Sequence, residues 1–338
     1  MATTVYKWVD VAKVIGIFLM IYGHGSLADM PVRDIIYTFH MPLFFVLSGL
    51  LYKPLSPCET LRKDCSKLLV PYLILNAFCL LRVLLLLVFK GEFTWHSLWQ
   101  HVGAVLMGLG YNTEEWIPVC TPCWFLIALF LCRMMLSFIH NRFNTKAILS
   151  LGLLALLADK ALIMADFDLL VPLDSALMAL PFICAGHLLK SVLLCEEKTK
   201  LLADIFIICL LLLLTIGCYY INNRVDMATF SFGNSMFLFY LGGLSGTFFI
   251  IKISKLLERS KLIIGGGILR TMATGTLPVI GLNLIVITYV KKIVGIVLPN
   301  TPVEGVLGFM VAIVCLLSFY PIILFCKKYF PAVLGFRK

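Results

Sequence analysis

Charged residues are scarce in this chain, and acidic residues are scarcer than basic ones. Only 14% of the 338 residues are charged, 18 acidic against 28 basic, whereas 61% are hydrophobic and the mean hydropathy is +1.00. Soluble globular domains carry about 25% charged residues, so this composition excludes that class. We therefore expect an all-α integral membrane protein in which residues 1–338 form a single transmembrane domain.

The chain also lacks a long basic patch and a disulfide framework. The net charge of +10 is spread over the connections between apolar runs, so the sequence does not predict a nucleic-acid partner. Most of the twelve cysteines lie inside apolar runs, where a thiol behaves as a small hydrophobe. Cys120 and Cys123 form an isolated CxxC pair. Zinc or redox chemistry there would need partners that the sequence does not show, and no metal is expected.

Ten apolar windows predict membrane-spanning helices, and residues 94–110 predict an interfacial or re-entrant helix. The first window has an acidic residue at its start and no clear cleavage site, so we expect it to persist in the mature protein. The ten windows cover residues 11–27, 36–52, 68–89, 122–140, 147–163, 173–190, 202–221, 235–253, 274–293 and 303–326.

The distribution of basic residues orients these helices. Arg82 and Arg133 lie within spans; of the other 26 lysines and arginines, 20 fall at or near the terminal segments and the connections on the same side, and 6 at or near the alternate connections. Cytoplasmic connections of membrane proteins carry the excess of basic residues. Both termini are therefore predicted to be cytoplasmic.

The first two windows carry polar side chains at defined depths. His24 follows Lys13 by eleven residues, which is roughly 16 Å along a helix and about half of a ~30 Å hydrocarbon layer. An ionisable group at that depth is costly and is by default functional. The second window returns antiparallel after a short connection, which places His40 at the depth of His24.

These two segments carry a family resemblance. DVAKVIGIFLMIYGH (10–24) followed by FHMPLFFVLSG (39–49) resembles the membrane-bound acyltransferase family 3, and most closely its branch of fucose 4-O-acetylases and other polysaccharide O-acetyltransferases. Later segments fit the same pattern in the same order. They are KLLVPY (67–72), CWFLIALF (123–130), LDSALMALPFICAG (173–186), GNSMFLFYLGGLSGT (233–247) and FPAVLG (330–335).

The resemblance implies a membrane O-acyltransferase that moves an acyl group, usually acetyl, from cytoplasmic acyl-coenzyme A to a carbohydrate hydroxyl. It also implies a bacterial cytoplasmic membrane, an acceptor that is free or lipid-linked, and the polysaccharide biosynthesis machinery as a partner. The family signature is a basic residue, usually arginine, then ten residues and a histidine. Here Lys13 replaces the arginine, which keeps the charge for coenzyme A but loses the bidentate fork.

Within this resemblance, His24 is the expected general base for the attacking hydroxyl. His40 is expected to orient His24, to donate to the oxyanion or to bind the acceptor. A covalent acyl-histidine intermediate remains an alternative.

Further polar and aromatic residues are candidates for substrate contacts. Arg82, inside a predicted span, is expected to bind the phosphates of coenzyme A or of a lipid carrier, or to form a structural ion pair. Tyr72 and Trp124 match aromatic positions of the family and line the donor or sugar path, or anchor helix ends. Asp174 lies in a family-like segment. Asn283 is expected in a polar pocket, although TMATGTLPVIGLNLIV departs from the family there.

One loop and one alternative function complete this interpretation. The loop over residues 90–121, with three tryptophans and Glu114 and Glu115, is the expected place for acceptor selectivity. Ten spans with intramembrane charges would also suit a polysaccharide or lipid-carrier transporter, or an export component without catalytic activity.

Overall fold

The computed structural model describes residues 6–143, 145–165, 167, 169, 172–195, 200–260 and 266–336. In these ranges all regular structure is helical, apart from an isolated antiparallel bridge between Asp226 and Ser231. The long helices are α1 (Lys7–Gly23), α2 (Met30–Leu50), α4 (Val70–Lys90), α6 (Trp124–Arg142), α7 (Thr145–Ala165), α8 (Leu173–Leu188), α10 (Leu201–Asn222), α11 (Met236–Arg259), α13 (Thr276–Val297) and α14 (Gly305–Tyr329). The shorter α-helices are α3 (Pro57–Asp64), α5 (Trp95–Met107), α9 (Lys190–Leu194) and α12 (Gly266–Thr274).

Each of the ten predicted windows falls on one of the long helices. Within the described residues, seven helical stretches are long and apolar enough to cross a membrane, and α1, α2 and α8 are not among them. The reason is that α1 and α8 have only 17 and 16 residues and that α2 begins with polar residues. The protein is therefore an all-helical integral membrane protein, whereas the count of ten spans and the cytoplasmic termini stay predictions.

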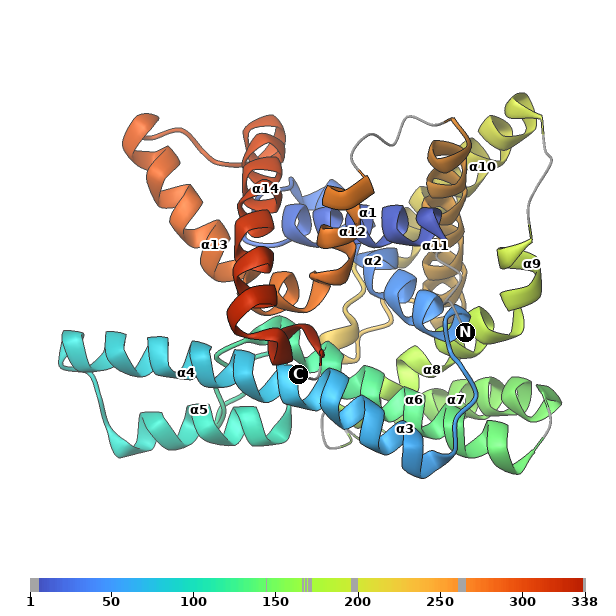
Figure 1. Ribbon diagram of the computed structural model, residues 1–338, viewed down its shortest axis with the longest axis horizontal. Helices are drawn as coiled ribbons and strands as arrows, with labels where there is room; N and C mark the ends of the chain where they lie inside the picture. The colour runs from blue at the N-terminus through green and yellow to red at the C-terminus, as the bar shows by residue number, and fades with distance from the viewer. Residues whose placement is uncertain are drawn as a thin grey trace.

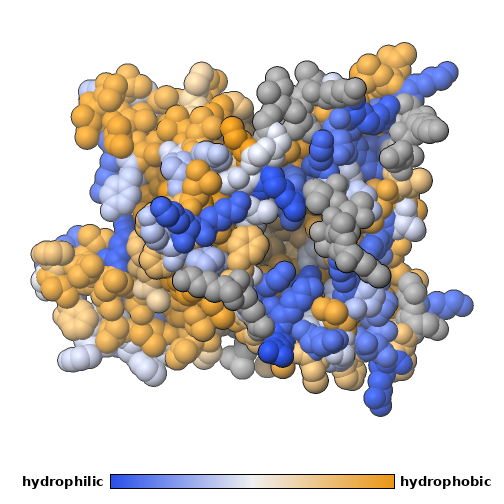
Figure 2. Space-filling view, viewed as in Figure 1, coloured by the Kyte–Doolittle hydropathy of each residue, from blue (hydrophilic) through white to orange (hydrophobic). Residues whose placement is uncertain are grey.

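The helices pack in groups around α1, α2 and α8. In Figure 1, α10 and α11 stand together at the upper right, α13 and α14 at the upper left, and α4, α5, α6 and α7 lie across the lower half. Apolar side chains cover the part of the surface where α4, α5 and α13 lie, as membrane-facing helices require (Figure 2).

Glycines bring the central helices into backbone contact. A Cβ atom at Gly49 of α2 would lie 2.0 Å from the carbonyl oxygen of Ile183, and one at Gly186 of α8 would lie 2.1 Å from the carbonyl oxygen of Val46. Only glycine permits this approach, which is typical of membrane helix pairs. The close packing holds the second predicted histidine helix, α2, rigidly against α8.

Candidate active site

His24 lies at the end of α1 and not inside a helix. The prediction of a helix over residues 11–27 is wrong at this end, because α1 stops at Gly23 and His24 has extended backbone angles. The chain then turns through Gly25 and Ser26, which both have positive φ, and a Cβ atom at Gly25 would lie 2.6 Å from Ile287. This turn takes the imidazole out of the helical register and presents it to α2 and α13.

Asn283 of α13 fixes the tautomer of His24. Its side-chain Nδ2 donates a hydrogen bond to the carbonyl oxygen of Ile280 at 2.6 Å, so Oδ1 is the atom that faces His24. The distance between His24 Nδ1 and Asn283 Oδ1 is 3.0 Å. Because Oδ1 can only accept, Nδ1 carries the proton and Nε2 of the neutral imidazole keeps its lone pair.

His40 lies beside His24, as the depth comparison predicts. The two ring centroids are 6.3 Å apart and the rings are perpendicular. The His40 Nδ1 atom donates to the carbonyl oxygen of Ile36 at 2.9 Å, so Nε2 of a neutral His40 is likewise free to accept. The ring of Tyr37 lies near both histidines, with its centroid 6.1 Å from that of His24, edge to face, and 5.1 Å from that of His40, tilted.

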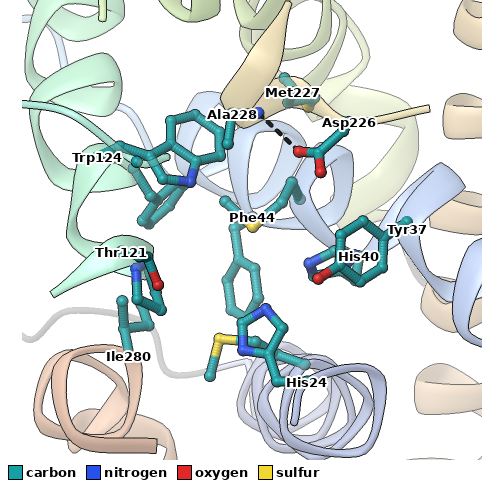
Figure 3. A pocket seen from close by; sticks show the side chains of 15 residues that line it. His24, Tyr37, His40, Phe44, Thr121, Trp124, Asp226, Met227, Ala228 and Ile280 are labelled. Carbon is teal, nitrogen blue, oxygen red and sulfur yellow. Dashed lines mark hydrogen bonds between the residues drawn. The ribbon is translucent and has the colours of Figure 1, made fainter. Parts of the chain in front are cut away.

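The two histidines line a cavity of about 110 Å³, here called the histidine cavity. Figure 3 shows His24, Tyr37, His40 and Trp124 arranged around this space, with Asp226 at its edge. The other lining residues are Met20, Met41, Phe44, Gly110, Thr121, Pro122, Phe125, Met227, Ala228 and Ile280. This volume admits the reacting ends of substrates but not a whole nucleotide.

A second cavity of about 350 Å³, here called the basic cavity, adjoins the first. Its charged lining residues are Asp10, Lys13, Lys67, Arg133 and Arg270. Figure 2 shows hydrophilic side chains around a hollow in the middle of the face it displays. A further open pocket, lined by Arg62 and Lys63 among others, shares Lys67, Gly335 and Phe336 with the basic cavity. Basic side chains thus continue from the protein surface inward.

Three apolar side chains separate the histidine cavity from the basic cavity. Phe44, Phe125 and Ile280 line both spaces, and we call them the apolar partition. The rings of Phe44 and Phe125 are 6.0 Å apart and meet edge to face. A bound ligand with an extended apolar or weakly polar arm that ran past these three side chains would reach from one cavity into the other.

The charges of the basic cavity are unequally compensated. Arg270 binds both carboxylate oxygens of Asp10, at 3.0 and 2.7 Å, so Asp10 does not pair with Lys13 as its spacing of three residues allowed. Arg133 binds Asp64 at 2.6 Å, and its second nitrogen donates to Ser48. In the part of the chain that the structure describes, Lys13 makes no ion pair and is left free for a ligand.

The basic cavity also borders an irregular helix. Cys65–Leu69 forms a short π-helix between α3 and α4, and it carries Lys67 into the wall shared with the outer pocket. Such π-turns occur often at functional sites because they re-aim side chains.

Four of the sequence-predicted residues line neither cavity: Asn283, which lies behind His24 and contacts the site through it, and Arg82, Tyr72 and Asp174. The guanidinium of Arg82 lies over the ring of Tyr289 at 5.9 Å, Tyr72 donates to the carbonyl of Val105, and buried Asp174 caps its neighbour Ser175. Tyr72 therefore joins α4 to α5. Ser175 in turn donates to the carbonyl oxygen of Met227 at 2.8 Å, so the start of α8 supports one wall of the histidine cavity.

Sequence reasoning missed Tyr37, Asp226 and Arg270. Tyr37 precedes His40 by three residues, and that spacing on a helix was a usable signal. Asp226 lies in the connection between α10 and α11, where its Oδ1 accepts from the backbone of Ala228 at 3.0 Å. Nothing local in the sequence marks Asp226 or Arg270, because both reach their cavities through long-range packing.

The histidine pair has no metal-site geometry around it. Among the described residues, no three His, Cys, Asp or Glu side chains lie close enough together to hold a metal ion. What the site does offer is two imidazole acceptors, an indole donor on Trp124 and a basic approach from one side.

Comparison with known proteins gives one finding. A family model described as an acyltransferase domain matches residues 6–321, which is nearly the whole chain. No curated protein and no solved structure matches the chain.

Proposed function

The chain belongs to acyltransferase family 3, and from this premise we propose that it is a membrane O-acyltransferase. The donor is an acyl-coenzyme A, with acetyl as the group transferred, and the acceptor is a hydroxyl of a carbohydrate. The observation that supports this most directly is the meeting of a basic cavity and a histidine cavity at three apolar side chains. A polyanionic donor with a neutral acyl arm fits that arrangement from one side.

In this proposal the phosphates of the donor bind in the basic cavity and the thioester passes the apolar partition. Lys13 faces that cavity without an ion pair among the described residues and supplies a point charge to a phosphate. Arg62, Lys63 and Lys67 extend the positive surface outward. With both termini in the cytoplasm, this entrance faces the cytoplasmic pool of acyl-coenzyme A.

His24 then acts as the general base. Its Nε2 lone pair takes the proton of the acceptor hydroxyl while that oxygen attacks the thioester carbonyl carbon. When the tetrahedral intermediate collapses, the carbon–sulfur bond breaks and Nε2 returns the proton to the departing sulfur. Asn283 accepts from Nδ1 throughout and stabilises the imidazolium that forms between these steps.

The oxyanion needs a donor that neutral His40 does not offer at Nε2. The indole nitrogen of Trp124 is always a donor, and within the described chain no hydrogen bond occupies it. Figure 3 shows Trp124 at the cavity wall across from the histidines. We assign the oxyanion contact to Trp124 and a second acceptor hydroxyl to His40 Nε2.

Arg82 is better placed to bind the acceptor substrate than to bind the acyl-coenzyme A donor. It lies outside the basic cavity, and among the described residues its buried Nε atom has no hydrogen-bond partner. Lys292 lies over the same Tyr289 ring at 5.7 Å, so two cations surround one aromatic group. An anion is needed there because an unpaired guanidinium in a span is costly. The phosphate of a lipid-linked acceptor, as in polysaccharide assembly at a bacterial cytoplasmic membrane, meets this need.

The test is acyl transfer by purified protein in lipid nanodiscs. Radiolabelled acetyl-coenzyme A and a panel of glycans are supplied, and labelled glycan and free coenzyme A are measured together. His24→Gln is expected to lower the rate by about 100- to 10,000-fold, the range for loss of a general base. His140→Gln, at a half-buried histidine outside both cavities, is the matched control.

Two results would contradict the proposal. If His24→Gln in correctly assembled protein kept the wild-type rate, His24 would not be the base. If glycans or lipid carriers crossed the bilayer of proteoliposomes without acylation, the protein would be a transporter.

A further inference from the structure

Three thiols converge beside the histidine cavity. The Sγ atoms of Cys120 and Cys123 are 2.8 Å apart, and both residues are buried, at 4% and 1% exposure. Cys79 of α4 approaches from the other side, because Cys79 and Cys120 both donate to the carbonyl oxygen of Gly281, at 3.8 and 3.3 Å. The partner that the sequence did not show for the CxxC pair is therefore Cys79, 41 positions before Cys120 in the chain.

The pair is built into the wall of the site. Thr121 and Pro122, the two residues between the cysteines, line the histidine cavity, and so does Trp124, which follows Cys123. The short 3₁₀ turn Thr121–Cys123 leads directly into α6. A covalent change at the two sulfurs therefore acts on side chains that face the reacting groups.

A second connection runs through α13. The Cys120 S–H is directed to Gly281, so the proton between the two sulfurs belongs to Cys123. Gly281 is adjacent to Ile280, whose carbonyl orients the amide of Asn283, which in turn holds His24. When Cys120 loses its thiol proton, the carbonyl oxygen of Gly281 loses one of its two thiol donors. The hydrogen bond from Cys79 remains.

We propose that Cys120 and Cys123 are a peroxide-sensitive modification site that closes to a disulfide and thereby tunes acyl transfer. One cysteine sulfur attacks hydrogen peroxide, the O–O bond breaks, and a sulfenic acid and one water form. The second thiol attacks the sulfenic sulfur, the S–O bond breaks, and the oxygen leaves as a second water. Overall, the two thiols lose two protons and two electrons, and one peroxide takes them up and becomes two waters.

The geometry favours this outcome over an inert pair. A disulfide needs about 2.05 Å between sulfurs, so the 2.8 Å contact closes with a small tightening of the turn. A peroxide molecule in the histidine cavity of about 110 Å³ would lie beside Thr121 and Pro122, the two residues between the cysteines. The predicted orientation places this turn on the outer side of the membrane, where disulfides persist. Cys79 also hydrogen-bonds the Cys120 sulfur, but Cys120 and Cys123 are the pair whose sulfurs lie 2.8 Å apart within a single turn.

Peptide mass spectrometry of the intact protein in nanodiscs tests the site without reference to activity. Protein treated with hydrogen peroxide or dithiothreitol is alkylated with N-ethylmaleimide, denatured and digested. After peroxide we expect a peptide that contains both Cys120 and Cys123, carries no N-ethylmaleimide on either, and is two hydrogens lighter than the unmodified peptide. Dithiothreitol should reverse this change. Cys120→Ser and Cys120→Ala must abolish it, and Cys315→Ser, at a buried cysteine elsewhere, must leave it unchanged.

The activity arm rests on the proposed function and is separate from the modification arm. We expect oxidation to lower the acyl-transfer rate by on the order of tenfold, since misplacement of reacting groups by about 1 Å costs up to about 100-fold. The Cys120→Ser/Cys123→Ser variant should not respond to peroxide. Three results overturn the proposal: no linked peptide, a Cys79–Cys120 link instead, or a Cys120–Cys123 link without any change in rate.

Discussion

Asn283 holds His24 in one tautomer: the Asn283 amide oxygen lies 3.0 Å from Nδ1 of the imidazole, and the amide nitrogen is itself held by the carbonyl of Ile280. The two residues are 259 positions apart in the chain. Asn283 is fully buried, so water does not compete for this contact. The lone pair on Nε2 is consequently available at every encounter with substrate.

Replacing Asn283 tests this positioning role. Asn283→Leu removes the acceptor of the Nδ1 proton, and we expect kcat for acyl transfer to fall on the order of 10- to 100-fold with little change in KM for either substrate. Asn283→Asp keeps an acceptor oxygen and should recover most of the rate. Equal loss in both variants, measured in steady-state assays, would mean that Asn283 only supports packing.

Trp124→Phe separates the indole N–H from the bulk of the ring. Trp124 packs against Gly110, where a Cβ atom would lie 2.5 Å from the indole, and phenylalanine preserves much of that contact. Loss of an oxyanion donor typically costs about 100- to 1,000-fold in kcat. Trp8→Phe, at a buried tryptophan outside the histidine cavity, is the control. A wild-type kcat for Trp124→Phe would remove the residue from the oxyanion assignment.

Lys13→Ala is expected to weaken donor binding and to leave the chemical step intact. A lost hydrogen bond to a charged group is worth about 1.5–3 kcal/mol, so KM for acetyl-coenzyme A should rise about tenfold or more, and less at high salt. Lys146→Ala, at an exposed lysine outside both cavities, should leave KM unchanged. Lys13→Arg should keep the wild-type KM or improve on it. A fall in kcat at constant KM would place Lys13 in another role.

Phe44 is expected to limit the length of the acyl group. Phe44 lines both cavities, and its ring lies against Gly16, where a Cβ atom would be 2.9 Å from it. Phe44→Leu widens the apolar partition, so kcat/KM for butyryl-coenzyme A relative to acetyl-coenzyme A should rise on the order of tenfold. An unchanged ratio in a competition assay with both donors would show that acyl groups do not pass Phe44.

The Arg133–Asp64 pair is expected to be the most costly ion pair to break. Asp64 is 1% exposed, and its carboxylate lies 2.6 Å from the guanidinium. Asp64→Ala leaves Arg133 uncompensated and should lower the free energy of unfolding by about 3–5 kcal/mol, measured in mixed micelles. The paired change Asp64→Leu with Arg133→Met should cost less.

An exposed pair provides the comparison. Arg224 pairs with Asp226 at 3.4 Å, and the arginine side chain is 50% exposed. Arg224→Ala should cost no more than about 1 kcal/mol. If both changes had the same effect, burial would not govern the strength of these pairs.

The helices and the histidine pair were predictable for a physical reason. A segment that enters lipid must be apolar along its length, so the ten windows stand out by composition and each of them falls on a long helix. His24 and His40 are joined by one short connection, and depth arithmetic alone brings them together. The family resemblance rests on the same local segments, and the family match confirms it, whereas the fucose O-acetylase branch stays a proposal.

What the local sequence does not contain is the partner of each polar group. The turn after α1 lies against Ile287 of α13, close to Gly25. Asp10 pairs with Arg270 and not with nearby Lys13, because α12 packs on α1. Arg82 was expected to bind the phosphates of coenzyme A or of a lipid carrier, or to form a structural ion pair. The packing of α4 and α13 places its guanidinium over the ring of Tyr289, which the local sequence does not indicate.

The sequence by itself determined that this is a helical membrane protein with two histidines at similar depth in its first two apolar segments, because hydrophobicity and short-range spacing are local properties. Only the tertiary structure decided that Asn283 holds His24, that Phe44, Phe125 and Ile280 divide two cavities, and that Cys79 joins the CxxC pair. Those relationships join residues far apart in the chain. They follow from how the helices pack against one another, which no local pattern in the sequence records.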